Sequence, residues 1–464
     1  MPSSSERDVR PVNVLILKSD EHNPRIASTD GHPFIRTPNL ERLAARGVVF
    51  ESAYCPSPLC VPSRSSFISG RPVHQIQTYN NSLVLERPNY PSYGAILDAA
   101  GVHSVHVGKV DAYRPPNELG FTEMFGTDYR GVGDTMISRE PLALRTDGLE
   151  RARDVGVAEN PFRGDDRRME DALAFLRRSA DLGRPWTMEV NLIAPHFPHR
   201  VTEELWELYA DHADLPEYDV TAPPAQHPYA ADLRRHFGTH VFTEELIRQH
   251  RRAYYGRVTY VDAQLGRLLE ALEATGQLDR TVVVYTSDHG EMLGMFGMWW
   301  KSSLYEDSVR VPLVVAGPGF PRGARVRTPV SHWDLRATIF AAVGVPYPDG
   351  LPGQPLQSLS REHRRDDRAV FAEYHGHGTR GSSFMVREGR WKLLYHAKAP
   401  HQLFDLDADP HELRDLASAR PDVVERLTRR LYDEFCDPVV EQDRAERFIR
   451  AQLAALDQAS AAAM

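Results

Sequence analysis

Three short apolar runs constrain the fold of this chain more than any other feature. They lie at residues 12–17, 281–286 and 311–316 and are rich in valine, leucine and isoleucine. Near-continuous apolar runs of this length are typical of strands that are covered on both faces. Between the first two runs, residues 245–274 place their apolar side chains on one helical stripe. This alternation of strands and helices predicts an α/β fold.

The composition is that of a globular protein and argues against one class of partner. The 464 residues are long enough for one large α/β domain with a smaller one. The formal net charge of −9 argues against nucleic-acid binding and gives no long-range attraction for anionic substrates. Any site for an anion must therefore be built by local charges.

Cysteine content and the N-terminal residues bear on location. The three cysteines, Cys55, Cys60 and Cys436, are too few for a disulfide scaffold and are typical of a reducing compartment. Residues 1–10 are polar, and the apolar run at 12–17 is too short for a signal-peptide core or a membrane span. We therefore expect a cytoplasmic protein with no membrane partner.

Acidic residues follow two of the predicted strands. Asp20 comes after the first strand, and Asp288 with His289 comes after the second. In open α/β sheets, ligand sites form outside the carboxyl ends of the strands, so these side chains are expected to meet there. Two carboxylates and an imidazole suit a divalent cation. The alternative is that each aspartate only caps a following helix.

A short motif around Cys60 indicates the chemistry. Residues 57–70 have the sequence SPLCVPSRSSFISG, in which Pro62 and the residues after it predict the start of a helix. The amides of such a helix start would point at an anion, and Arg64 would lie one turn along. The pattern C-x-P-S-R resembles the signature of type I sulfatases. In that family the cysteine is oxidised to formylglycine, whose hydrated aldehyde is the nucleophile.

Further segments resemble the same family in the same order. Residues 13–20 resemble the opening strand and first metal ligand of the alkaline-phosphatase-like sulfatases, and residues 287–294 resemble their second metal segment. Residues 403–412 resemble a C-terminal D-L-x-x-D-P-x-E segment, so that the likeness covers about residues 12–417. Three single residues match family motifs: Lys109 in G-K, His196 in P-H-x-P and Lys301 in K-x-x-x-Y-E.

The resemblance implies an alkaline-phosphatase-like three-layer sandwich around a large mixed sheet. It also implies a smaller C-terminal α+β subdomain built on a short antiparallel sheet. We predict a catalytic domain over residues 1–365 and a C-terminal subdomain over 366–464. Within the latter, residues 384–395 have the pattern of a β-hairpin, and 444–456 that of a helical tail that could mediate homo-oligomerisation.

The resemblance also implies roles for individual residues and partners. The cofactors would be one divalent cation, Ca²⁺ first and Mn²⁺ or Mg²⁺ as alternatives, and formylglycine made from Cys60 by a maturation enzyme. The implied catalytic residues are Cys60, Arg64, Lys109, His196 and Lys301; the metal ligands are Asp20, Asp288, His289 and converted Cys60; and Asp111 would bind substrate. Apart from the resemblance, His375 and His377 flank a glycine in a predicted loop, where histidines face solvent or substrate, and we predict that His375 binds substrate.

Three positions depart from the common family pattern. Glu21 stands where many sulfatases have a second aspartate, and either ligates the metal through its longer arm or lies outside the ligand set. Asp111 stands where many have a histidine, which resembles the arylsulfatase K-like branch, whose substrates are 2-sulfated glucuronate residues. The alternative for Asp111 is a surface or capping carboxylate. Phe296 replaces a histidine often found shortly before the lysine.

Three functions follow from these patterns. The first is hydrolysis of a small-molecule or saccharide sulfate ester, for example a 2-sulfoglucuronate. The second is hydrolysis of phosphonate monoesters or phosphodiesters on the same scaffold. The third is a non-catalytic anion-binding or glycan-binding protein in which Cys60 stays a thiol. Two long surface segments, 128–166 and 214–239, are expected to select the ligand.

Overall fold

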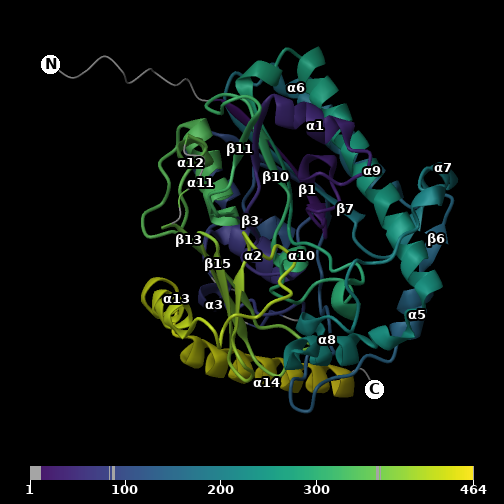
Figure 1. The fold of residues 1–464 in the computed structure, drawn as a ribbon. Helices are drawn as coiled ribbons and strands as arrows, with labels where there is room; N and C mark the ends of the chain where they lie inside the picture. Colours follow the sequence, from purple (N-terminus) through teal and green to yellow (C-terminus); the bar gives the residue numbers. More distant parts are fainter. Residues whose placement is uncertain (1–11, 83, 86–88, 362–364, 366, 463–464) are drawn as a thin grey trace.

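The structure is a computed structural model that describes residues 12–82, 84–85, 89–361, 365 and 367–462. Its centre is an eight-stranded mixed sheet (Figure 1). In spatial order the strands are β11 (Ala324–Val326), β2 (Gly47–Phe50), β10 (Leu313–Ala316), β9 (Thr281–Ser287), β1 (Asn13–Asp20), β7 (Trp186–Pro195), β4 (His103–Lys109) and β5 (Glu123–Asp128). The three predicted apolar strands are therefore β1, β9 and β10, side by side in this sheet.

The strand directions decide where side chains can converge. β1 runs parallel to both β7 and β9, and β4 runs parallel to β7 and β5. β10 is antiparallel to β9 and β2, which makes the sheet mixed, as predicted. The carboxyl ends of β1, β4, β7 and β9 thus lie at one edge of the sheet, where ligand sites form in α/β proteins.

Helices cover both faces of the sheet, which confirms the predicted three layers. Val14 and Ile16 pack on the face that holds α2 (Cys60–Ser69), α4 (Tyr93–Ala99) and α11 (His332–Val343). Leu15 and Leu17 pack on the opposite face, under α1 (Pro38–Ala45), α6 (Arg163–Ser179) and α9 (Glu244–Ala274). Because successive residues of a strand point to opposite faces, the continuous apolar run of β1 serves both cores. α9 agrees with the predicted helix.

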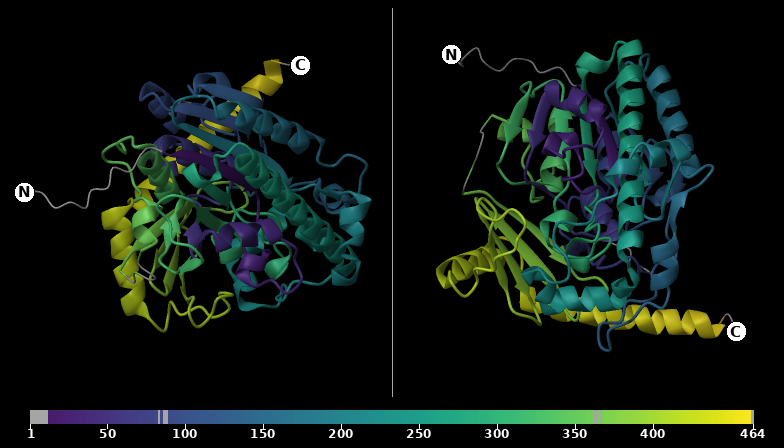
Figure 2. Two further views of the ribbon diagram at one scale, coloured as in Figure 1. Left: turned by 90° about the horizontal axis from the view of Figure 1, so that it is seen from above. Right: turned by 45° about the vertical axis from the view of Figure 1, so that its right-hand side comes forward.

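A separate antiparallel sheet of four strands follows in the chain, as predicted. It consists of β13 (Ala369–Tyr374), β14 (Ser383–Glu388), β15 (Trp391–His396) and β16 (Gln402–Asp405). β14 and β15 pair as the predicted hairpin. α13 (Pro421–Glu434) packs on this sheet, and α14 (Pro438–Ala462) runs along one side of the molecule (Figure 2). The predicted boundary at residue 366 lies outside the described residues, so the domain division stays a prediction.

The two long segments predicted to be surface excursions contain regular structure. Residues 128–166 include α5 (Gly148–Arg153), β6 (Val155–Val157) and the start of α6, and residues 214–239 include α8 (Pro228–Phe237). α8 buries Leu233 and Phe237 in the main core, which a purely surface segment would not do. Among the described residues, no helix is both long enough and apolar enough to span a membrane.

Candidate functional site

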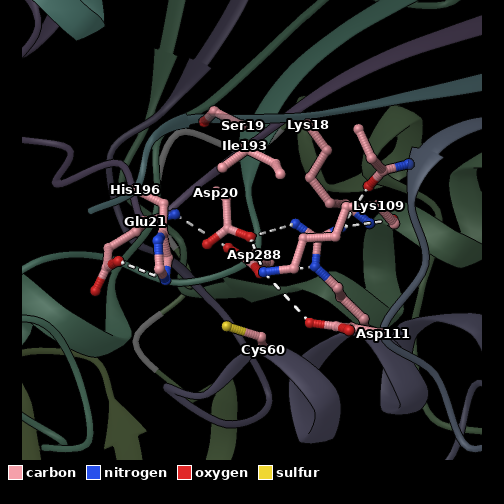
Figure 3. Close-up of polar contacts among 12 residues, drawn as sticks. Lys18, Ser19, Asp20, Glu21, Cys60, Lys109, Asp111, Ile193, His196 and Asp288 are labelled. Atoms are coloured by element: carbon pink, nitrogen blue, oxygen red, sulfur yellow. Dashed lines mark hydrogen bonds and ion pairs between the residues drawn. The ribbon is translucent and has the colours of Figure 1, made fainter. Parts of the chain in front are cut away.

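The predicted site residues converge at the carboxyl edge of the large sheet (Figure 3). Asp20 ends β1, Lys109 ends β4, and Asp288 directly follows β9. His196 follows β7 by one residue. Cys60 is the first residue of α2, whose side chains are buried along its whole length. Four parallel strands and one helix start therefore direct their side chains into the same space.

Four of these residues form a group that can hold a metal ion. Ligand atoms of Asp20, Cys60, Asp288 and His289 all lie within 4.8 Å of one another, and this is the ligand set predicted from the sequence. A second such group contains Asp20, Glu21 and His196. His289 Nδ1 lies 3.0 Å from the carbonyl oxygen of Gly290, which leaves Nε2 directed at the other ligands.

Two buried carboxylate oxygens of the site lack partners. Asp20 Oδ1 and Glu21 Oε1 make no hydrogen bond within the described part of the chain. Since a buried oxygen without a partner costs free energy, these atoms are suited to a ligand that the protein does not itself supply. Carboxylate oxygens with one imidazole are donors that calcium, manganese or magnesium accept. The residues present therefore fit a divalent cation.

Cys60 lies fully buried among positive groups. Its Sγ is 3.3 Å from His289 Nε2. Burial opposes ionisation of the thiol, but the positive charges of Lys109, Lys301 and His289 together hold the pKa of Cys60 well below its ordinary value. Burial alone would lower the pKa of His289, whereas Asp288 and Cys60 raise it to about 9. This position consequently favours a negatively charged group.

Arg64 forms hydrogen bonds to both aspartates of the candidate metal group. Its Nε donates to Asp288 Oδ2 at 2.8 Å, and its Nη2 donates to Asp20 Oδ2 at 3.1 Å. Its Nη1 donates to Asn191 Oδ1 at 2.7 Å. Burial works against ionisation of Asp20, but Lys109, which donates directly to Asp20 Oδ2, and other cations lower the pKa of that carboxyl group. Asp20 is therefore held as a carboxylate.

His196, Lys301 and Glu21 form the more open part of the site. Lys301 Nζ lies 2.7 Å from His196 Nε2 and 3.0 Å from Glu21 Oε2. The side chain of His196 is 21% exposed, whereas Glu21 is fully buried. Burial raises the pKa of Glu21 to about 7, although Lys301 and His196 oppose this shift. His196 is thus the most exposed of this trio, since the side chain of Lys301 is 10% exposed.

Backbone strain is concentrated beside these residues. Glu21 (φ 69°), Asp111 (φ 38°), Trp300 (φ 64°) and Ser302 (φ 78°) have positive φ values without being glycine. Such conformations are costly for residues with a side chain and often mark functional positions. Each of the four lies within two residues of Asp20, Lys109 or Lys301. The surrounding fold therefore imposes the directions in which the site side chains point.

The two predicted substrate-binding residues differ in placement. Asp111 lies in the site: its Oδ2 is 3.4 Å from Lys109 Nζ and 2.9 Å from Arg130 Nη2. It is buried, so the alternative interpretation as a surface carboxylate is wrong. His375 is fully buried, and its two ring nitrogens lie 2.7 Å from Glu373 Oε2 and 2.8 Å from Ser382 Oγ. Because both nitrogens are engaged, this placement does not support the prediction that His375 binds substrate.

Two site residues were not predicted from the sequence. Asn191 holds Arg64 from within β7, and a polar residue inside that buried strand was a usable signal. Arg130 reaches Asp111 from a segment without regular structure. Its sequence context contains no motif, so only the fold reveals it.

Comparisons with known proteins agree with this geometry. Residues 12–345 match the family model described as Sulfatase, and residues 294–436 match one described as N-sulphoglucosamine sulphohydrolase, C-terminal. The chain is 32% identical to choline-sulfatase of Rhizobium meliloti over 94% of this chain and 90% of that protein. It is 31% identical to arylsulfatase K of Danio rerio over 90% of this chain and 83% of that protein.

Solved structures share the fold at low sequence identity. A 2-O GAG sulfatase superposes with a TM-score of 0.71 at 22% identity, over 95% of this chain and 94% of that chain. The phosphonate monoester hydrolase of Silicibacter pomeroyi superposes with a TM-score of 0.71 at 24% identity, over 90% of this chain and 94% of that chain. At these identities the likeness concerns the fold alone.

Proposed function

The chain belongs to the sulfatase family and is a sulfuric ester hydrolase, and from this premise we propose that it hydrolyses a sulfate monoester with formylglycine made from Cys60 as its nucleophile. The observation that carries the proposal is the position of Cys60. It is buried at the start of α2, beside His289 and within the candidate metal group. A thiol needed only for packing would not require these charged neighbours.

The cationic residues suit the charge of a sulfate ester. Such an ester carries its charge on three oxygens, so cations around them stabilise the transition state. Lys109 is a buried cation and Lys301 a largely buried one, and the charge of each lowers the pKa of Cys60. Arg64 holds Asp20 and Asp288 in fixed directions through charge-assisted hydrogen bonds. These residues would bind the sulfate and orient it toward position 60.

The leaving alcohol requires a proton. His196 Nε2 is the nitrogen that faces Lys301 and Glu21, because Nδ1 contacts the carbonyl oxygen of Phe197. A histidine in hydrogen-bond reach of the departing oxygen acts as a general acid. We assign this role to His196, since it is the most exposed member of its trio. His106 of β4 is not assigned this role, because burial lowers its pKa to about 4 and it is therefore neutral, with no proton to donate as an imidazolium.

The proposed reaction needs a divalent cation and formylglycine, and residues of this chain would hold the first and form the second. Asp20, Asp288, His289 and position 60 would hold the cation, and Glu21, with its unpartnered oxygen, is an additional candidate ligand. When bound, the cation supplies positive charge to the sulfate oxygens and to the hydrated aldehyde of formylglycine, which is the attacking group. Carboxylate-rich coordination favours Ca²⁺, and the imidazole keeps Mn²⁺ and Mg²⁺ as alternatives.

The proposed substrate is a sulfated saccharide such as a 2-sulfoglucuronate. Similarity to arylsulfatase K and the position of Asp111 beside Lys109 support this choice. Maturation would require a formylglycine-generating enzyme. A cytoplasmic location and homo-oligomerisation stay predictions; the three cysteines form no disulfide with one another, which is compatible with a reducing compartment.

The test compares two esters of one alcohol. Protein co-produced with a maturation enzyme and supplied with Ca²⁺ or Mn²⁺ is assayed with the sulfate monoester and with a phosphodiester of the same phenol. We expect kcat/KM to favour the sulfate ester. Preference for the diester would overturn the proposal in favour of a phosphodiesterase on this scaffold, and turnover of neither ester would leave an anion-binding protein.

A further inference from the structure

Arg151 of α5 lies beside the site and forms no direct ion pair with a carboxylate of the described residues. Its guanidinium carbon is 4.2 Å from the ring centroid of Trp300 and 4.8 Å from that of Phe197. Nε is buried and makes no hydrogen bond, and within the described residues no carboxylate lies within ion-pair distance of Arg151. Burial, followed by the charge of Arg145, lowers the pKa of Arg151. Asp147, Glu21 and Asp134 oppose this shift from a distance, but none of them contacts the guanidinium directly.

The two rings locate this charge relative to the catalytic residues. Trp300 directly precedes Lys301, and Phe197 directly follows His196. The charge of Glu21 is among those that act on Arg151. Arg151 consequently stands on the His196 and Lys301 side of the site, where the proposed leaving alcohol would be. It is not part of the group that surrounds Cys60.

Two nearby arginines, Arg130 and Arg145, are each paired with carboxylates. Arg130 donates to Asp111 at 2.9 Å, and Arg145 donates to Asp134 at 3.2 Å and to Asp147 at 2.9 Å. A partly buried guanidinium without such a partner costs free energy, which is recovered when an anion binds to it. Of these three arginines, Arg151 is the one whose charge is still available to a ligand.

The aromatic rings at this position also favour an anionic ligand group over a cationic one. Quaternary ammonium groups are bound over the faces of aromatic rings. Here the faces of Trp300 and Phe197 are already covered by the guanidinium of Arg151. A cationic leaving alcohol would have to displace a residue of its own charge, whereas an anionic one would meet an available donor.

We propose that Arg151 is a specificity-determining residue that binds a second anionic group of the substrate, a carboxylate or a second sulfate, next to the ester that is cleaved. The inference rests on the proposed function, because it assigns the leaving alcohol to the side of His196. It predicts selection for acidic sugars and against cationic alcohols such as choline.

The test measures binding rather than turnover. In a Cys60→Ala background, which removes the nucleophile, calorimetry with Ca²⁺ present gives affinities for methyl glucuronoside 2-sulfate and methyl glucoside 2-sulfate. These ligands differ only at C6, which is a carboxylate in the first and a hydroxymethyl group in the second. We expect the carboxylate to improve affinity about tenfold or more. Methyl glucoside 2,6-disulfate shows whether a second sulfate replaces the carboxylate.

Variants connect the preference to Arg151. Arg151→Met keeps an apolar side chain over the rings and should reduce the preference to about twofold or less, and Arg151→Lys should restore part of it. Arg153→Met removes an equal charge from the exposed side of the same helix and should retain the full preference. Any one of four results would overturn the inference. These are equal affinities for the first two ligands, no detectable binding of either, tighter binding of choline sulfate, and a preference that survives Arg151→Met.

The outcome is separable from that of the proposed function. Carboxylate preference in the Cys60→Ala protein without sulfate hydrolysis by the matured enzyme would retain the role of Arg151 and reject the proposed reaction. Hydrolysis of sulfate esters with no dependence on Arg151 would do the reverse.

Discussion

Two buried charge clusters lie at the same end of β1 but differ in how completely their charges are paired. In the first, Lys18 donates to Glu189 Oε1 at 2.6 Å, and Tyr93 donates to Glu189 Oε2 at 2.5 Å. In the second, Asp20 Oδ2 accepts from Lys109 and Arg64, but Oδ1 has no partner among the described residues. Only one residue, Ser19, separates Lys18 from Asp20.

The difference separates structural from functional charge. The Lys18 cluster is closed, since both carboxylate oxygens of Glu189 have donors and the lysine also lies 3.5 Å from the centroid of the Phe67 ring. The Asp20 cluster keeps unpartnered oxygens, strained backbone and a partly exposed histidine. A closed cluster contributes to stability, whereas an open one is suited to a ligand. Substitutions in the two clusters should therefore affect different measurements.

The largest effect is expected for Asp20→Asn. The change retains size and removes the charge of a proposed metal ligand, so kcat/KM should fall at least about 1,000-fold. Metal content, measured by mass spectrometry of the purified protein, should fall with it. Cooperative unfolding should persist. Near-normal activity would show that the open cluster is not the metal site.

Glu189→Gln should act mainly on stability. It leaves the buried ammonium of Lys18 without a counter-charge, so the free energy of unfolding in urea should fall by about 3 kcal/mol. The double change Lys18→Met with Glu189→Leu, which removes both charges, should be much less destabilising. The comparison fails if the single variant is as stable as the parent protein.

Acid should weaken the closed cluster in a defined range. Burial would raise the pKa of Glu189, but Lys18 and its other partners lower it from 4.5 to about 2. Because the folded-state pKa is lower than the unfolded one, the stabilisation is complete above about pH 4.5 and is lost as the pH falls toward 2. The stability difference between parent and Glu189→Gln should shrink by about 2 kcal/mol between pH 6 and pH 3. A constant difference would contradict this assignment.

The smallest effect is expected for His375→Gln. Its ring nitrogens contact Glu373 and Ser382 rather than the site, so the loss should be about 1 kcal/mol of unfolding free energy. KM for the sulfate ester should stay within about twofold of the parent value, as for other changes outside a binding site. A large rise in KM at unchanged stability would return His375 to the substrate-binding residues.

More of the site than of its surroundings could be predicted from the sequence. The residues of the metal group lie at strand ends and a helix start, positions that apolar patterning identifies, and the structure brings them together. α5 and α8 were not foreseen because they are short helices in polar segments, where periodicity is weak. Arg130 could not be placed because its contact with Asp111 depends on the path of an irregular segment.

His375 illustrates the opposite case. Histidines near a glycine in a predicted loop resembled ligand-facing residues, yet Glu373, two residues earlier in β13, lies within hydrogen-bonding distance of one ring nitrogen. Whether a histidine faces a ligand or a buried carboxylate depends on packing, which residue type and spacing do not encode. Family motifs predicted positions well because they record the outcome of that packing.

The central claim, that Cys60 becomes the nucleophile, is tested most directly by the mass of the peptide that contains residue 60. The protein is produced with and without a formylglycine-generating enzyme, and the converted fraction is compared with sulfate-ester turnover in the same samples. We predict an aldehyde at position 60 in the active samples and turnover proportional to the converted fraction. Full turnover by protein whose Cys60 remains a thiol would contradict the account.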